Sequence, residues 1–489
     1  METGTSNRIP PEVLRFFNKP GGHSLIVRGS AGTGKTTFAL QTIESLAGVE
    51  QSVYHSSRVT DLSLLTQFPW LRDLEGKVDR SDAHAGSGAG SETGGRSGLS
   101  DLKGIQGSPV AVPKGERLTV SIGRDMGELE GLYRTIEEGL PKKSLVVIDS
   151  IDALAEKYGI PCAKLLNTIQ RDIVEVYGSD VLFVVENGDT SLDYLGDGVI
   201  NLSRSEFNRR RLRELEILKL RGCEIQQPRY IFTLDGGRIR TFSYQKALGM
   251  PGAPRRWPPI PDLDGRPSTG IADLDRFMGG LEIGSVVLIE LGPGVPAAIS
   301  EALELSVALN FVAQRRGVLW VPMRRASAER ARARTVGFVP EEDFDRYVRI
   351  PERSEQLSSP GPYVMPVEGS SAISDLRWPN VEYSLSGAQR PFLALMGFDS
   401  LQSTYGRDVG DDLMDLIAQF RRNHGVVVAL APSSRGSNSR LADLATNWLR
   451  VDRIDGTVVL YGEEPFTECY SLQFEDREVG GRVSLVPIS

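Results

Sequence analysis

The sequence contains few cysteines, no long apolar run and only a moderate excess of one charge. Its three cysteines lie far apart and match no metal-ligand spacing: Cys162, Cys223 and Cys469. No stretch approaches the roughly 18 apolar residues of a membrane-spanning helix. The opening METGTSNRIPPEVLRFF lacks the apolar core of a secretory signal. We therefore expect a soluble, cytoplasmic protein without a membrane partner.

The charge balance argues against a protein whose whole surface is made for nucleic acid. The formal net charge is −8 and the pI is near 5.4, although a local basic face remains open. A chain of 489 residues is too long for one ordinary hydrophobic core, so two domains are expected.

Short apolar segments alternate with helix-like segments along the first half. SLIVRG, SVYHSS, SLVVID and SDVLFVVEN have the length of buried strands, and amphipathic segments separate them. This alternation predicts an α/β fold with a mostly parallel sheet flanked by helices. Residues 81–108 are Gly/Ser-rich and are predicted to be a flexible insertion within a domain spanning 1–244.

The second half repeats this order of elements after a segment rich in proline and glycine. Residues 245–267 are predicted to be an interdomain linker, and 268–489 a second module of the same type. The segment 204–215 and the segment 324–336 are dense in arginine. Each is either a contact for a protein or nucleic-acid partner or a solvated helix face or loop tip.

A glycine-rich loop between a predicted strand and a predicted helix satisfies the pattern G-x-x-x-x-G-K-[ST]. Glycines allow backbone N–H groups to approach phosphate oxygens, the lysine reaches the β- and γ-phosphates, and the hydroxyl after it ligates Mg²⁺. The following helix directs its positive dipole end at the anion. The predicted ATP-binding residues are Gly29, Ser30, Ala31, Gly32, Thr33, Gly34, Lys35, Thr36 and Thr37.

A P-loop also needs a second acid near its metal. Asp149 ends the apolar strand SLVVID, so the strand brings its carboxylate to the edge of the sheet where ligands bind. We predict that Thr36 and Asp149 hold Mg²⁺, whereas Asp152 is expected at a helix start.

The corresponding loop of the second half, ELGPGVPAAI, has lost these groups. Alignment places Ala297 and Ala298 where Lys35 and Thr36 stand, and Pro296 where a glycine stands, while Asp399 aligns with the acid of the first half. The second module is therefore predicted to bind no nucleotide and to serve assembly, a partner or reporting of the first module's state.

The set GSAGTGKTT, VVIDSIDAL, LFVVEN, LGDGVINL and LEILKLRG resembles the KaiC branch of the RecA-type ATPases. STGIADLDRFMGGLEIGSVVLIE resembles the opening of a second such domain. The degenerate second module and the segments SSRVT and QFPW resemble the archaeal gas-vesicle regulator GvpD group within that branch. The resemblance implies two tandem RecA-like modules, ATP with Mg²⁺, and a homo-oligomer, hexameric in that family.

The resemblance also implies roles for single residues. Lys219 and Arg221 would reach the nucleotide of a neighbouring subunit and stabilise charge on its γ-phosphate, unless they simply form an exposed strand face. Arg58 and Val59 stand where active relatives carry paired glutamates that polarise the attacking water, and a guanidinium is no general base. Glu186 matches a family glutamate that could touch the water, or is only a strand-end residue.

Two functions follow from these observations. The first is an ATP-binding regulatory protein in which the nucleotide switches assembly or a partner surface and hydrolysis is slow or absent. In the gas-vesicle group that role is control of transcription through another protein. The second is a DNA-directed RecA-type ATPase, which would need a competent water activator and a basic inner surface. The missing glutamates and the acidic net charge favour the first.

Overall fold

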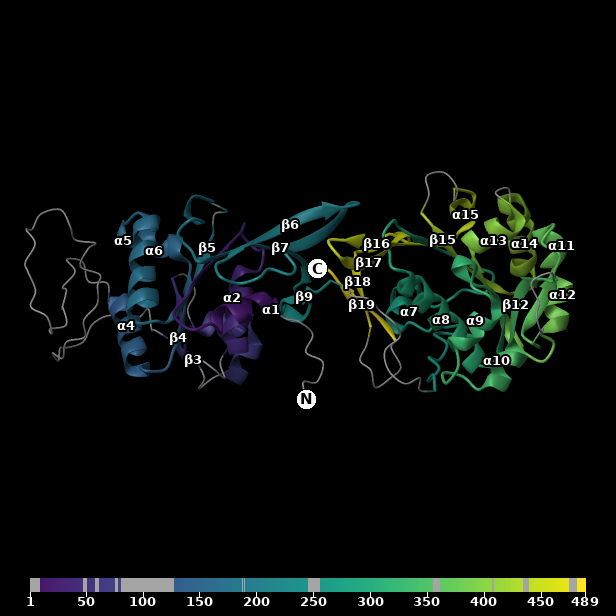
Figure 1. Ribbon diagram of the computed structural model, residues 1–489, viewed down its shortest axis with the longest axis horizontal. Coiled ribbons are helices and arrows are strands. Elements are labelled where there is room, and N and C mark those ends of the chain that lie inside the picture. The colour runs from purple at the N-terminus through teal and green to yellow at the C-terminus, as the bar shows by residue number, and fades with distance from the viewer. Residues whose placement is uncertain are drawn as a thin grey trace, which may run out of the picture. The chain divides into compact units, whose positions relative to one another are not determined.

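A computed structural model describes residues 9–46, 51–57, 61–74, 78–80, 127–186, 188, 190–244, 256–354, 361–406, 409–433, 439–474 and 482–489. The chain divides into two compact units, Met1–Ser243 together with Ser489, and Tyr244–Ile488 (Figure 1). Each unit is a sheet with helices on both faces, so the expected α/β architecture of two tandem RecA-like modules is confirmed.

The first unit is built on a nine-stranded sheet in the order β3-β2-β4-β5-β1-β6-β7-β8-β9. Strands β3 to β6 in this order are parallel, and β7, β8 and β9 continue the sheet antiparallel. The strands are β1 (Ser24–Arg28), β2 (Gln51–Ser56), β3 (Val78–Arg80), β4 (Ser144–Asp149), β5 (Asp180–Val185), β6 (Gly198–Phe207), β7 (Arg210–Leu220), β8 (Arg229–Thr233) and β9 (Arg240–Phe242).

Alternate residues of the central strands pack into two hydrophobic layers, as expected of a parallel sheet buried on both faces. Leu25 and Val27 of β1 pack with α1 (Pro11–Phe17) and α2 (Lys35–Leu46). Ile26 faces the other way, toward the remaining helices of the unit. These are α4 (Gly127–Gly139), α5 (Ile151–Tyr158) and α6 (Cys162–Gln170), while α3 (Asp61–Gln67) adds Leu64 to the first layer.

The second unit repeats this topology in a ten-stranded sheet, β13-β12-β11-β14-β15-β10-β16-β17-β18-β19. Its outer strands β17, β18 and β19 are antiparallel and the others are parallel. The strands are β10 (Val286–Leu291), β11 (Arg316–Val321), β12 (Val348–Arg353), β13 (Val364–Val367), β14 (Gln389–Gly397), β15 (Val426–Pro432), β16 (Asn447–Ile454), β17 (Thr457–Glu464), β18 (Tyr470–Phe474) and β19 (Val483–Pro487).

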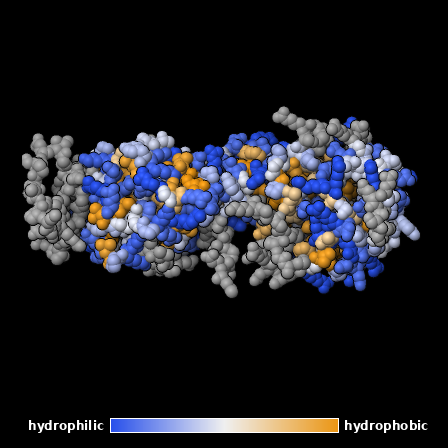
Figure 2. Space-filling view, in the orientation of Figure 1, coloured by the Kyte–Doolittle hydropathy of each residue, from blue (hydrophilic) through white to orange (hydrophobic). Residues whose placement is uncertain are grey.

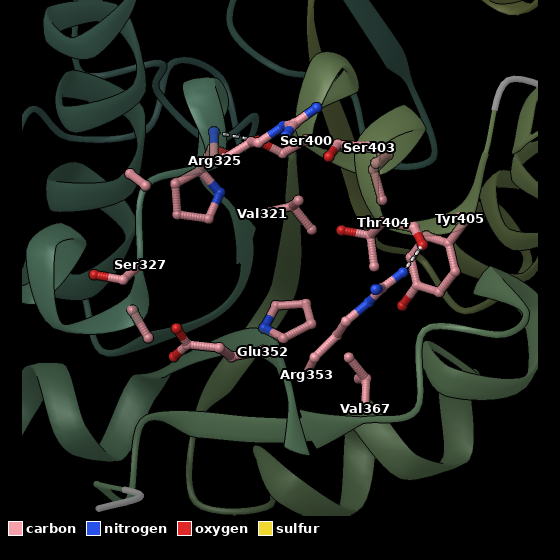
Figure 3. A pocket seen from close by; sticks show the side chains of 15 residues that line it. Val321, Arg325, Ser327, Glu352, Arg353, Val367, Ser400, Ser403, Thr404 and Tyr405 are labelled. Carbon is pink, nitrogen blue, oxygen red and sulfur yellow. Dashed lines mark hydrogen bonds between the residues drawn. The ribbon is translucent and has the colours of Figure 1, made fainter. Parts of the chain in front are cut away.

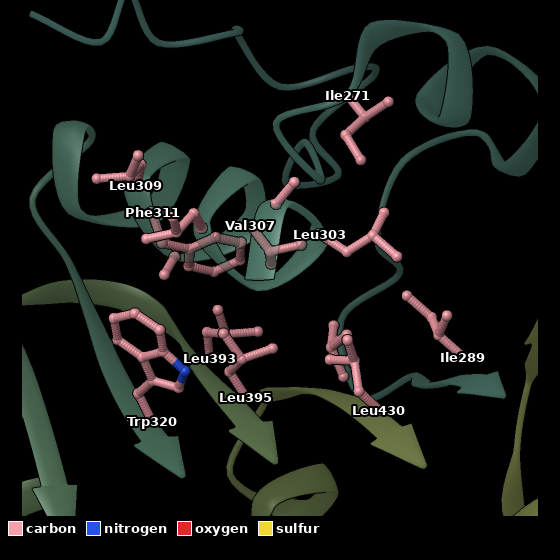
Figure 4. Close-up of a cluster of buried hydrophobic side chains, with 14 of the residues drawn as sticks. Ile271, Ile289, Leu303, Val307, Leu309, Phe311, Trp320, Leu393, Leu395 and Leu430 are labelled. Atoms are coloured by element: carbon pink, nitrogen blue, oxygen red, sulfur yellow. The ribbon is translucent and has the colours of Figure 1, made fainter. Parts of the chain in front are cut away.

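Helix α8 (Ala297–Ala313) forms the centre of one hydrophobic layer of this unit. Its side chains Leu303, Val307 and Phe311 lie over Trp320 and Leu395 of the sheet (Figure 4). A helix apolar almost all round is one buried on all sides. The same layer includes α7 (Ala272–Met278), α9 (Ala328–Ala333) and α10 (Glu341–Tyr347). The opposite face carries α11 (Ala372–Asp375), α12 (Trp378–Ser384), α13 (Phe398–Tyr405), α14 (Val409–Arg422) and α15 (Ser439–Leu444).

Helix α6 ends at Gln170, and the chain continues as a π-helical turn, Arg171–Val176. The predicted linker lies outside the described residues at 245–255. The rest of it packs on the second unit: Trp257 is 2% exposed, and its backbone N–H donates to the Phe338 carbonyl oxygen. The predicted insertion at 81–108 also lies outside the described residues.

Hydrophilic residues cover most of the face of the protein shown in Figure 2. Among the described residues, none of the helices combines the length and the apolar character that crossing a bilayer requires.

Candidate nucleotide site

The loop 29–34 joins the end of β1 to the first residue of α2. Its glycines adopt backbone angles that L side chains avoid, with φ of 150° at Gly29, 72° at Gly32 and 105° at Gly34. A Cβ at Gly29 would lie 2.1 Å from the Leu202 carbonyl oxygen. The loop thus requires glycine both for its conformation and for its close approach to β6.

Lys35 fills the loop with its side chain, which is only 7% exposed. Its Nζ donates hydrogen bonds to the carbonyl oxygens of Gly29 at 2.7 Å and Ser30 at 2.9 Å. These contacts hold a positive charge inside the turn at the start of a helix, where phosphate oxygens are favoured.

Thr36 and Asp149 lie together, although they are far apart in sequence. Thr36 Oγ1 donates to Asp149 Oδ2 at 2.7 Å, and the hydroxyl of Tyr54 on β2 donates to the same oxygen at 3.0 Å. Burial raises the pKa of Asp149, hydrogen bonds from Thr36 and Tyr54 oppose this, and the charge of Glu186 adds to it. A hydroxyl and a carboxylate beside a phosphate loop are oxygen ligands suited to Mg²⁺.

Glu186 directly follows β5, the strand that lies between β4 and β1. It is therefore at the same edge of the sheet as Asp149, and its backbone N–H donates to Asp152 Oδ2 at 2.6 Å. Asp152 lies in the first turn of α5, where the sequence placed it. Arg58 and Val59 lie outside the described residues.

Lys219 and Arg221 do not join this constellation. Lys219 is paired with Val199, close to the residue at which β6 begins. Because β6 runs parallel to β1, this end of β6 lies at the sheet edge opposite the P-loop, which follows the end of β1. Lys219 donates to the Gly196 carbonyl. Arg221 pairs with Asp197 at 2.8 Å while its side chain stays 66% exposed.

The arginine-dense segment 204–215 is neither a helix face nor a loop. It is a β-hairpin in which a two-residue turn, Asn208 and Arg209, joins β6 to β7, with φ of 48° and 64° typical of a type I′ turn. The alternating pattern on both sides of the turn was the sequence signal for this hairpin.

Two arginines of this hairpin contact the P-loop, which the sequence did not predict. Arg204 and Arg213 are paired across the strands, and both donate to the Gly32 carbonyl oxygen, Arg213 at 3.2 Å. Burial lowers the pKa of Arg213, and the charges of Arg204 and Arg211 lower it further. The hairpin therefore concentrates positive charge beside the loop that would receive phosphates.

The corresponding loop of the second unit differs in conformation as well as in residues. Pro296 precedes α8 with φ of −60°, whereas Gly34 precedes α2 with φ of 105°. The carboxylate of Asp452 lies against the loop, because a Cβ at Gly292 would be 1.8 Å from its Oδ1. An anion at this place repels a phosphate.

The alignment of Asp399 with Asp149 is wrong by two residues. Asp149 pairs with Val184, which pairs with Val27, two residues before the P-loop. In the second unit Ile289 is the equivalent of Val27; it pairs with Leu430, and Leu430 pairs with Gly397. Gly397 therefore occupies the position of Asp149. Asp399 instead lies in the first turn of α13 and accepts the backbone N–H of Arg324 at 2.8 Å.

The second arginine-dense segment, 324–336, is partly committed to ion pairs within the unit. Arg332 pairs with Glu341 and Asp345, and Arg334 pairs with Glu301, each at 2.8 or 2.9 Å. The helix within it, α9, is only six residues long.

Known proteins are similar to this chain over most of its length. Residues 13–219 match the family model described as GvpD gas vesicle protein, P-loop domain. Over 484 residues the chain is 25% identical to protein GvpD2 of Halobacterium salinarum, covering 94% of this chain and 92% of that protein. Protein GvpD1 of the same strain is 23% identical over 544 residues, with 98% and 96% covered.

A weaker similarity extends to the circadian clock oscillator protein KaiC. The protein from Thermosynechococcus vestitus is 29% identical over 270 residues, which are 53% of this chain and 46% of that protein. The resemblance to KaiC and GvpD proteins is thus confirmed, and the match to a P-loop domain falls on the first unit.

Proposed function

We propose that the first unit binds one ATP with Mg²⁺, and that this nucleotide switches the assembly or partner binding of a regulatory protein. The observation that carries the proposal is the P-loop with Lys35 folded into it and Thr36 bonded to Asp149. The chain's similarity to GvpD proteins favours regulation of gas-vesicle genes through a protein partner.

In this proposal the residues 29–37 hold the phosphates through their N–H groups, and Lys35 exchanges two carbonyl oxygens for phosphate oxygens. Thr36 and Asp149 would hold Mg²⁺, which neutralises phosphate charge when bound. Asp149 must be ionised for this role, and its hydrogen bonds from Thr36 and Tyr54 favour that state.

We further propose that hydrolysis is slow or absent. The sequence places Arg58 and Val59 where the water-polarising glutamates of active relatives stand. Glu186 supplies a carboxylate at the same edge of the sheet, where its charge acts on Asp149.

Lys219 and Arg221 fit a role in trans. They lie at the sheet edge opposite their own P-loop, so they could reach only the nucleotide of a neighbouring protomer. A ring, hexameric as the resemblance implies, would give them that position and would couple ATP occupancy to assembly.

Calorimetric titration of the full chain with ATP and Mg²⁺ tests the proposal. Wild type and the control Lys164→Ala, an exposed lysine of α6, should bind one nucleotide per chain, and Lys35→Ala none. Two equivalent nucleotides per chain, or unchanged binding by Lys35→Ala, would contradict it. Turnover on the order of ten per second would refute slow hydrolysis, and salt-sensitive binding of single-stranded DNA coupled to turnover would favour the recombinase-type function.

A further inference from the structure

The second unit contains a cavity of about 410 Å³ that is separate from its degenerate phosphate loop. The cavity lies where β11, β12 and β13 end, and residues 400–405 of α13 form one of its sides (Figure 3). Two strands, β14 and β15, separate β11 from β10 and its loop. Ligands of open α/β sheets bind at this carboxyl edge, and the volume is in the range of small-molecule sites.

Two guanidinium groups line the cavity, from Arg325 and Arg353. Within the described part of the chain, neither forms an ion pair with a carboxylate. Arg353 donates from Nη2 to the Thr404 carbonyl, and its Nε is buried without a hydrogen-bond partner among those residues. A guanidinium that is not ion-paired with a carboxylate suits an anionic ligand such as a phosphate.

The backbone has an unusual conformation at Arg325, one of the residues that line the cavity. Arg324 and Arg325 have φ of 59° and 51°, a left-handed conformation that is unusual for two consecutive non-glycine residues. Their N–H groups donate to Asp399 Oδ2 and Ser400 Oγ, both of α13, which fixes the turn. Such backbone outliers persist where the surroundings over-determine them, often beside a ligand.

The rest of the lining mixes apolar side chains with polar ones, and the polar ones lie on two sides. Ser403, Thr404 and Tyr405 lie on the side of Arg353, while Glu352 and Ser327 lie across the cavity from them (Figure 3). The Tyr405 phenol is protonated at neutral pH and can donate a hydrogen bond, and burial raises its pKa further. A carboxylate on this side can accept hydrogen bonds from hydroxyl groups at the uncharged end of a ligand.

We propose that this cavity binds a small organic phosphate that carries hydroxyl groups, with its phosphate toward Arg325 and Arg353 and its hydroxyls toward Glu352. The second module would then have kept the ligand-binding edge of the fold for a different ligand after losing the phosphate loop. This inference is independent of nucleotide binding by the first unit.

Titration of the full chain with ribose 5-phosphate, ribose and inorganic phosphate tests the proposal. Ribose 5-phosphate should bind, ribose should not, and inorganic phosphate should bind more weakly. The same result is expected for Lys35→Ala, which has lost the phosphate site of the first unit. Arg353→Gln should weaken binding about tenfold or more. The matched control is Arg330→Gln, an exposed arginine of α9 outside the cavity lining, which should bind like wild type.

Ser403→Asp is a second variant that keeps the contact between Arg353 and Thr404 intact. It places a negative charge in the cavity and should also weaken binding about tenfold or more. Absence of binding by wild type, loss of binding in Lys35→Ala, or equal affinities of wild type, Arg353→Gln and Ser403→Asp would overturn the proposal. Equal affinities for inorganic phosphate and ribose 5-phosphate would overturn the role given to Glu352.

Discussion

Replacing Glu304 with glutamine should make the second unit more stable at alkaline pH. Glu304 lies on the buried helix α8 and is 1% exposed. Its Oε1 accepts the Met323 N–H at 2.8 Å, and its Oε2 has no hydrogen-bond partner among the described residues. Burial raises the pKa of this carboxyl from 4.5 to about 8. The group is therefore largely protonated in the folded protein at pH 7 but ionised in the unfolded chain.

The sign of the effect follows from the raised pKa. Below pH 4.5 Glu304 is protonated in both the folded and the unfolded protein, so its full contribution to the free energy of unfolding is present. This contribution is lost as the pH rises from 4.5 to about 8, because the unfolded chain releases the proton and the folded protein keeps it. One pH unit corresponds to about 1.4 kcal/mol, so the loss over this interval is about 5 kcal/mol. A glutamine cannot ionise, yet its carbonyl oxygen can still accept the N–H of Met323. Glu304→Gln should thus resemble wild type at pH 4.5 and exceed it at pH 8.

Urea unfolding at several pH values, followed by tryptophan fluorescence, measures this difference. Four of the five tryptophans lie in the second unit, and Trp320 is completely buried there. The control Glu301→Gln changes a more exposed glutamate one turn earlier on the same helix and should keep the pH dependence of wild type. Unfolding free energies of wild type and Glu304→Gln that run parallel from pH 5 to pH 8 would refute the reasoning.

Two further predictions concern the phosphate loops. Arg204→Gln should weaken ATP binding about tenfold, since a charged donor beside the loop is worth about 1.5 kcal/mol. Arg211→Gln changes another exposed arginine of the same hairpin, one that does not donate to Gly32, and should have a smaller effect. Equal affinities of Arg204→Gln and Arg211→Gln in calorimetry would contradict the prediction. The double variant Ala297→Lys and Ala298→Thr should not restore nucleotide binding to the second unit. Pro296 cannot adopt the φ of 105° found at the equivalent glycine, and a second bound nucleotide would disprove this.

The sequence predicted the parts of the site that are local in the chain. The P-loop is one contiguous motif, so its spacing alone placed Lys35 and Thr36, and the apolar strand SLVVID brought Asp149 to the edge of the sheet. Tyr54 and Arg204 were missed because they come from other strands, and only the strand order brings them to the loop. Their own neighbours in the sequence carry no signal of a phosphate site.

The error at Asp399 shows why a degenerate copy is harder to interpret than an intact motif. The dipeptide Asp-Ser occurs in both halves, but the strand ladder places Gly397 at the position of Asp149. A Cβ at Gly397 would lie 2.7 Å from the Met323 backbone nitrogen, so no carboxylate fits there without moving the turn that follows β11. The second unit therefore has no equivalent of Asp149, because packing as well as substitution excludes it. Because the same Met323 segment leads into the strained turn at Arg325, the close packing that excludes the acid also helps to build the wall of the new cavity.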